Sequence, residues 1–233
     1  VEFVVSSKTD SMTIGKSQEA EFSVSMGAVK SLQTLEFKLT LSSGLTLVPN
    51  SVTMISATNL KMEALTFTPQ TMMINGYGSG TYSSDKATTI MTFKCKVAEG
   101  ATVGEQEVKL SDFSNADDEY QQIESHSTTK KITLVSEISS KTTLTGTLTT
   151  PTKGGTNESA LSGENVNAQV TWRPELTDNK FAANTAYMAT ITVTPKQYYS
   201  FGNGASVDFG GLTFKKSGES FVATKKFAKT ASR

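Results

Sequence analysis

One histidine and one cysteine, His126 and Cys95, limit the metal and nucleophile chemistry open to this chain of 233 residues. A zinc site needs three or four nitrogen and sulfur ligands, which these two side chains cannot supply. His126 lies in a polar, serine-rich stretch that favours an exposed loop, although a Ser–His–Asp arrangement stays open because every serine is a candidate nucleophile. Cys95 alternates with Lys94 and Lys96, which predicts an inward-facing, unreactive thiol. Neither residue indicates a catalytic centre.

Two other segments have compositions that could bind ions. The acidic residues 117–119, with Asp112 nearby, offer oxygen ligands to calcium, but they lack the alternating spacing of a calcium loop, which favours a solvated acidic turn. Residues 76–80 carry three glycines, but no Gly-Lys-Ser/Thr and no helical pattern follow, which favours a hairpin loop over a phosphate-binding loop. No pair of carboxylates is singled out as a glycosidase requires. We therefore expect no enzyme activity, no cofactor and no metal.

Aromatic side chains are the remaining candidates, because their faces can stack on sugar rings. Trp172 is the only tryptophan, and its strand-like surroundings favour a core position between two sheets. Tyr77, Tyr82 and Tyr120 lie near glycine-rich or acidic segments and are better placed for sugar contact. The alternative for each of the three is an ordinary loop aromatic.

Short strands must hold these residues in place. Residues 186–193 alternate Ala, Met, Thr and Thr with Tyr, Ala, Ile and Val, and this period of two predicts a strand with one buried face. About nine such segments with turn signals precede Ser136, which is typical of an antiparallel sandwich. The alternation predicts inward-facing Phe37, Leu39, Phe93 and Val97 in the first half, and Trp172, Tyr187 and Ile191 in the second.

The alternation is lost after Ser136, where Ser, Lys and Thr predominate. We therefore predict an all-β chain with two β-sandwich domains, at residues 1–138 and 144–233, joined by a linker at residues 139–143. The charge is balanced, with 22 basic and 22 acidic residues, and the basic ones are nearly all Lys, which argues against nucleic-acid binding. No apolar run is long enough to insert into a membrane. Residue 1 is Val, which predicts a segment of a longer chain.

The first half, about residues 2–138, resembles the cohesin family. The matching segments occur in the family's order, at residues 14–16, 20–25, 29–39, 44–48, 90–97, 104 and 108–112. The resemblance implies a nine-stranded jelly-roll sandwich that holds a dockerin protein or, as in related domains, a polysaccharide.

The second half, about residues 144–230, resembles an Ig-like repeat of bacterial surface proteins. Its matching segments are residues 151–154, 170–174, 181, 185–191, 196, 199–201 and 227–230. Tyr198 stands where the family usually has Gly, so the turn before Tyr199 is expected to differ. The resemblance implies a spacer or wall-proximal stalk with no chemistry of its own.

The cohesin resemblance also implies a partner face on the third, fifth, sixth and eighth strands. Alternation along these strands turns seven side chains outward: Glu36, Lys38, Met73, Asn75, Tyr77, Glu107 and Lys109. Met73 and Tyr77 are then apolar groups on a polar sheet, as anchors of a protein interface are. The alternative is that a loop covers Met73 and that Tyr77 closes a hairpin.

We interpret the chain as a non-catalytic, monomeric, extracellular module of a bacterial surface protein. It recruits a dockerin-like protein or a polysaccharide, in polysaccharide catabolism or cell adhesion. The alternative hypothesis is a structural stalk or adhesin segment with no ligand of its own.

Overall fold

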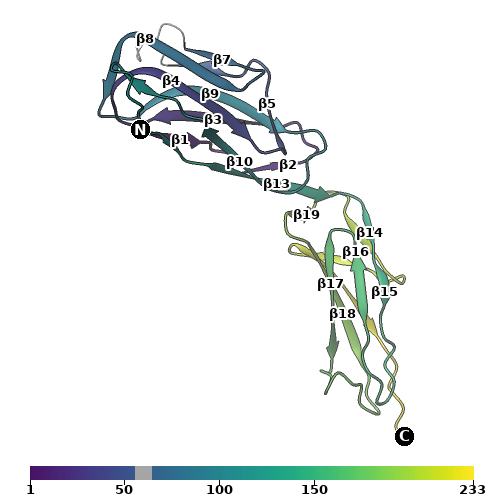
Figure 1. Cartoon of the computed structure of the whole chain (residues 1–233). Coiled ribbons are helices and arrows are strands. Elements are labelled where there is room, and N and C mark those ends of the chain that lie inside the picture. The colour runs from purple at the N-terminus through teal and green to yellow at the C-terminus, as the bar shows by residue number, and fades with distance from the viewer. Residues whose placement is uncertain (56–64) are drawn as a thin grey trace. The chain divides into compact units, whose positions relative to one another are not determined.

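All elements in the computed structural model are β-strands, and the residues it describes are 1–55 and 65–233 (Figure 1). The chain divides into two compact units, Val1–Val135 and Ser136–Arg233. Among the described residues no helix has the length and apolar character needed to cross a membrane. The prediction of an all-β fold is confirmed.

The first unit contains two sheets. One has the order β12 (His126–Ser127), β1 (Glu2–Ser6), β3 (Glu19–Met26), β9 (Thr88–Val97) and β5 (Leu45–Leu47), and β6 (Thr53–Met54) also pairs with β9. The other has the order β13 (Lys130–Ile138), β10 (Gly104–Ser111), β4 (Val29–Leu41), β8 (Met73–Ser84) and β7 (Thr66–Thr68). In addition, β11 (Ala116–Asp117) pairs with β4, and β2 (Ser11–Thr13) pairs with β13.

The core of the first unit lies between these two sheets, as in a jelly-roll sandwich. Phe3 on β1 and Phe37 on β4 come from different sheets, and their ring centroids are 5.3 Å apart. Phe22 and Phe93, on paired strands β3 and β9, stack at 5.2 Å. The inward direction predicted for Phe37, Leu39 and Phe93 is confirmed, because each is at most 1% exposed. Val97 is partly buried and packs against the same core.

The glycines of residues 76–80 do not form the predicted hairpin loop. They lie inside β8, which continues from Met73 to Ser84 beside β4 (Figure 1). Gly76 is buried opposite Leu35, and a Cβ on it would come within 2.8 Å of Leu65 Cδ1. The glycine therefore gives room for close packing inside a strand and does not mark a turn.

The second unit is built on a six-stranded sheet. Its order is β15 (Thr145–Thr147), β16 (Ala160–Gly163), β17 (Val166–Arg173), β18 (Met188–Pro195), β22 (Ser220–Lys226) and β21 (Lys215–Ser217). A smaller layer pairs β14 (Lys141–Thr143) with β20 (Ser206–Asp208), and β19 (Tyr199–Phe201) with residues 136–138 of β13. Phe201 of this layer meets Phe221 of the large sheet, with ring centroids 4.8 Å apart. The two layers enclose the core expected of a sandwich.

A linker is predicted at residues 139–143, and the structure places a strand in part of this segment. Residues 141–143 form β14, Thr142 is 7% exposed, and the division between the units falls three residues earlier than the predicted end of the first domain. The polar Ser/Lys/Thr composition concealed a strand whose pairing with β20 satisfies its backbone. Tyr198 has a left-handed backbone, with φ of 71°.

Candidate partner-binding face

The seven residues predicted from alternation lie on one side of the second sheet of the first unit. Register pairs Glu36 with Asn75 and Lys38 with Met73, between β4 and β8. On the other side of β4, Lys109 of β10 pairs with Thr40. Glu107 lies two residues before Lys109 and so points to the same side. We call this surface the β4–β8–β10 face, defined by Glu36, Lys38, Met73, Asn75, Tyr77, Glu107 and Lys109.

Tyr77 is the exposed large hydrophobic side chain on the β4–β8–β10 face. It is 56% exposed and pairs with Thr34, and because β8 runs on to Ser84 it does not close a hairpin. Gly76 and Gly78, its neighbours along the strand, are buried on the opposite, core-facing side of the sheet. Met73 is partly buried, with Lys38 and Thr68 as its cross-strand neighbours. The two apolar groups thus lie on one strand, four residues apart.

Charges of both signs surround these two side chains. Asn75 Nδ2 donates to Glu36 Oε2 at 2.6 Å, which holds both side chains along the sheet surface. Glu107 pairs in register with Lys131 of β13, and Lys131 Nζ lies 3.7 Å from Glu105 Oε2. Such an exposed ion pair adds little stability. The face itself is neutral overall, because Glu36 and Glu107 balance Lys38 and Lys109.

Asn115 supports this face and was not identified from the sequence. It is 1% exposed, its Oδ1 accepts from the backbone N–H of Glu36 at 2.9 Å, and its Nδ2 donates to Ser125 Oγ at 2.7 Å. The backbone N–H of Ser114 also donates to the carbonyl of Glu36. Asn115 therefore fastens the segment before β11 to β4 at the centre of the face. Asn115 is one polar residue among others in an acidic segment, so the sequence does not indicate that it binds the backbone of Glu36.

Neither His126 nor Cys95 takes part in a reactive group. Cys95 is fully buried, and burial raises the pKa of its thiol to about 12, so the prediction of an unreactive core residue is confirmed. His126 is exposed, but it lies in the short strand β12 and not in a loop. Its Nε2 lies 3.2 Å from Glu124 Oε1, and the flanking Ser125 and Ser127 donate to backbone carbonyls. Neither flanking serine is therefore held as a nucleophile.

The acidic segment forms a structured turn. Asp117 Oδ1 accepts from the backbone N–H groups of Glu119 and Gln121, at 2.9 and 2.8 Å. No group of three or more His, Cys, Asp or Glu suited to a metal occurs in the described part of the chain. The carboxylate of Asp117 thus stabilises its own turn, and this turn holds Tyr120 with 84% of the side chain exposed.

The other aromatic candidates belong to cores. Tyr82 is partly buried against the core of the first unit, and its hydroxyl lies 3.1 Å from Thr88 Oγ1, so it is not placed as a free sugar platform. Trp172 is 7% exposed and meets Phe181 edge-to-face at 4.9 Å. Tyr187 and Ile191 are buried as well, at 3% and 0% exposure. The core positions predicted for the second half are confirmed.

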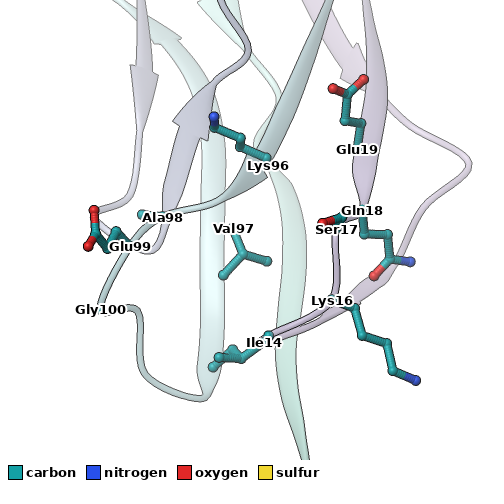
Figure 2. A pocket seen from close by; sticks show the side chains of 11 residues that line it. Ile14, Lys16, Ser17, Gln18, Glu19, Lys96, Val97, Ala98, Glu99 and Gly100 are labelled. Atoms are coloured by element: carbon teal, nitrogen blue, oxygen red, sulfur yellow. The ribbon is translucent and has the colours of Figure 1, made fainter.

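A hollow of about 770 Å³ opens at one end of the first unit, between residues 14–19 and 96–100. Figure 2 shows Ile14 and Val97 inside it, while the charged ends of Lys16 and Glu99 spread to opposite sides. The charges do not converge on one point, so the hollow lacks the arrangement of a binding or catalytic centre.

Solved cohesin structures align with somewhat more than half of the chain. A non-cellulosomal cohesin from the hyperthermophilic archaeon Archaeoglobus fulgidus aligns with 58% of this chain and 92% of its own, at 10% identity and a TM-score of 0.44. The seventh ScaB type I cohesin from Pseudobacteroides cellulosolvens aligns with 59% and 96%, at 15% identity and a TM-score of 0.41. A cohesin from Clostridium acetobutylicum aligns with 57% and 90%, at 16% identity and a TM-score of 0.40. No protein-family model and no curated protein matches the sequence.

Proposed function

We propose that the first unit is a non-catalytic module that binds a protein partner on the β4–β8–β10 face. The observation that carries the proposal is Tyr77, an exposed aromatic in the middle of a paired strand, with Met73 four residues away on the same side. Protein interfaces are anchored by such amphipathic side chains within a polar surround. The charges of Glu36, Lys38, Glu107 and Lys109, two of each sign, supply that surround.

A dockerin-like protein is the partner that we propose, because the order of the sequence motifs resembles cohesins over residues 2–138. A polysaccharide is the second candidate, since a single tyrosine can stack on one sugar ring. Among the described residues the face carries one aromatic, Tyr77, and a flat protein contact uses the neighbouring Met73 as well, which favours the protein. We further propose that the module works outside the cell as a monomer.

A capture experiment tests the proposal. The full chain is immobilised and exposed to dockerin-containing proteins from a bacterial surface fraction, and in parallel to a glycan array. We expect retention of a protein by the natural chain and loss of that protein with the Met73→Asp, Tyr77→Ala double variant. A folded double variant that keeps the protein removes the β4–β8–β10 face from consideration. Binding to neither proteins nor glycans leaves the stalk hypothesis.

A further inference from the structure

The second unit carries a broad polar face on the outer side of its six-stranded sheet. Its residues align in rows across the strands because β17, β18 and β22 pair without interruption. The four rows are Arg173–Met188–Lys226; Thr171–Thr190–Thr224; Gln169–Thr192–Val222–Lys215; and Thr145–Ser162–Asn167–Thr194–Ser220–Ser217, in which the hydroxyls of Thr194 and Ser220 lie 3.2 Å apart. The alternate residues on these strands, including Trp172, Ile191 and Phe221, are buried in the core. We call these rows the β17–β18–β22 face.

No side chain in the four rows is a carboxylate, and three are cations: Arg173, Lys215 and Lys226. All three are exposed, and none has an ion-pair partner among residues 1–55 and 65–233. The carboxylates closest in sequence lie off the rows, Glu164 and Glu219 in turns and Glu175 after Pro174. The cations of this face are therefore available to an anion from outside.

The first unit gives the opposite pattern on its own strands. On the outer side of β3 and β9, Glu19 pairs with Lys96 and Glu21 with Lys94, so each cation faces an acid. The second unit as a whole has eleven Lys and Arg against seven Asp and Glu, a net charge of +4, while the first has eleven against fifteen, a net charge of −4. The overall neutrality of the chain thus conceals two units of opposite charge.

We propose that the β17–β18–β22 face binds an extended polysaccharide that carries carboxylate groups. The three cations pair with carboxylates of the polymer, and the exposed amides and hydroxyls of Asn167, Gln169 and Thr171 hydrogen-bond to its sugar hydroxyls. The rows provide a flat surface of small side chains along which a polymer can lie, and no deep pocket is needed.

Other classes of partner fit this face less well. Double-stranded DNA presents a phosphate about every 1.7 Å along its axis, a density that three separated cations do not match. The large hydrophobic side chains that are exposed in the described residues, Val4, Ile55, Tyr77 and Tyr120, all lie in the first unit, so the β17–β18–β22 face lacks both a membrane anchor and a protein hot spot.

Affinity electrophoresis of the full chain in native gels tests the proposal, with polygalacturonate, alginate or fully methyl-esterified pectin in the gel. We expect retardation by the two acidic polymers, none by the methyl ester, and weaker retardation as salt screens the charges. The Arg173→Gln, Lys215→Gln, Lys226→Gln variant is expected to lose affinity about tenfold, the sum of three exposed ion pairs.

The matched control is Lys8→Gln, Lys30→Gln, Lys86→Gln, which removes three exposed charges from the first unit and is expected to keep the affinity. Equal losses in both variants, or equal binding of the methyl ester, would show attraction that is not specific to this face and overturn the proposal. Failure to bind either acidic polymer overturns it as well, and so does equal binding to single-stranded DNA. None of these outcomes bears on the proposed protein partner of the first unit, because neither variant changes a residue of the β4–β8–β10 face.

Discussion

The two units bury their apolar side chains in different ways. In the first, the described core residues form one cluster between two sheets of similar size, with aromatic pairs such as Phe3–Phe37 across the layers. In the second, the core is divided into a cluster around Ile191 and Phe201 and an aromatic cluster around Trp172 and Phe181. The outer side of the large sheet in the second unit is polar and carries three exposed cations. The comparison shows that one chain combines an exposed aromatic, Tyr77, on one unit with a cationic polar face on the other.

Removing residues 136–143 from the second unit is expected to have the largest effect. Residues 1–135 and 136–233 each contain their own core, so each fragment is expected to unfold cooperatively alone. Residues 144–233 lack β14 and the strand partner of β19, and are expected to lose most of a stability of about 5–15 kcal/mol. Circular dichroism during heating checks this. Equal stability of 136–233 and 144–233 would mean that residues 136–143 are a linker after all.

The next largest effect is expected from truncating a core side chain of one unit, which should leave the other unit unchanged. Phe37→Ala is expected to destabilise the first unit by about 3–5 kcal/mol, because Phe37 is fully buried against Phe3 and Phe113. Trp172 is the only tryptophan, so its fluorescence reports the second unit, while circular dichroism reports both. We expect the fluorescence transition in urea to stay in place while the circular dichroism transition splits.

The converse variant sharpens the same comparison. Phe181→Ala, beside Trp172, is expected to move the fluorescence transition and to leave the other transition unchanged. If either variant shifts both transitions together, the two units unfold as one and the comparison fails.

A smaller effect is expected from the support of the β4–β8–β10 face. Asn115→Ala leaves the buried N–H of Glu36 and the hydroxyl of Ser125 without this partner, which costs about 1–3 kcal/mol. Ser114→Ala is the control, because Ser114 contacts Glu36 through its backbone. Urea unfolding of the two variants is compared, and a loss no greater than that of the control would show that Asn115 does not fasten this segment.

The last expected effect appears only at alkaline pH. The Cys95 thiol has its pKa raised from an ordinary value of 9.0 to about 12 by burial. Below pH 9 the thiol is neutral in both states and its stabilisation is fully present. Between pH 9 and 12 the unfolded chain loses the proton that the folded chain keeps, so stability falls by up to about 1.4 kcal/mol per pH unit. Cys95→Ala is expected to show a shallower loss over this range in urea unfolding, and parallel slopes would contradict the assignment.

Alternation predicted much of the first unit because its strands are long and one-sided. The strand β4 holds Phe37 and Leu39 on its inner side as predicted, and the direction of Glu36, Lys38 and Tyr77 followed from the same period. The sequence did not predict that the glycines of residues 76–80 lie inside a strand, nor did it predict the short strands β16, β19 and β21. These segments are strands because they pair with neighbours, and not because of their own β-propensity.

The sequence predicts which side of the sheet each site residue faces, but not which residues it contacts. Alternation indicates which side a residue faces, while the register that places Asn75 beside Glu36 depends on how β4 and β8 align. Asn115 lies 79 residues from Glu36 along the chain, and no local pattern relates the two. The opposite net charges of the two units cancel in the whole chain, which has 22 acidic and 22 basic residues, so the total gives no sign of them.

The central claim is that the β4–β8–β10 face of the first unit holds a protein partner through Met73 and Tyr77. Calorimetric titration of a captured partner into three folded proteins tests it: the natural chain, the Met73→Asp, Tyr77→Ala variant, and Val4→Asp as a control on the opposite sheet, where Val4 is 41% exposed. We expect affinity to fall about 100-fold in the double variant, as loss of an interface anchor does, and to stay unchanged with Val4→Asp. Equal affinity of the natural chain and the double variant, or a comparable loss with Val4→Asp, would contradict the claim.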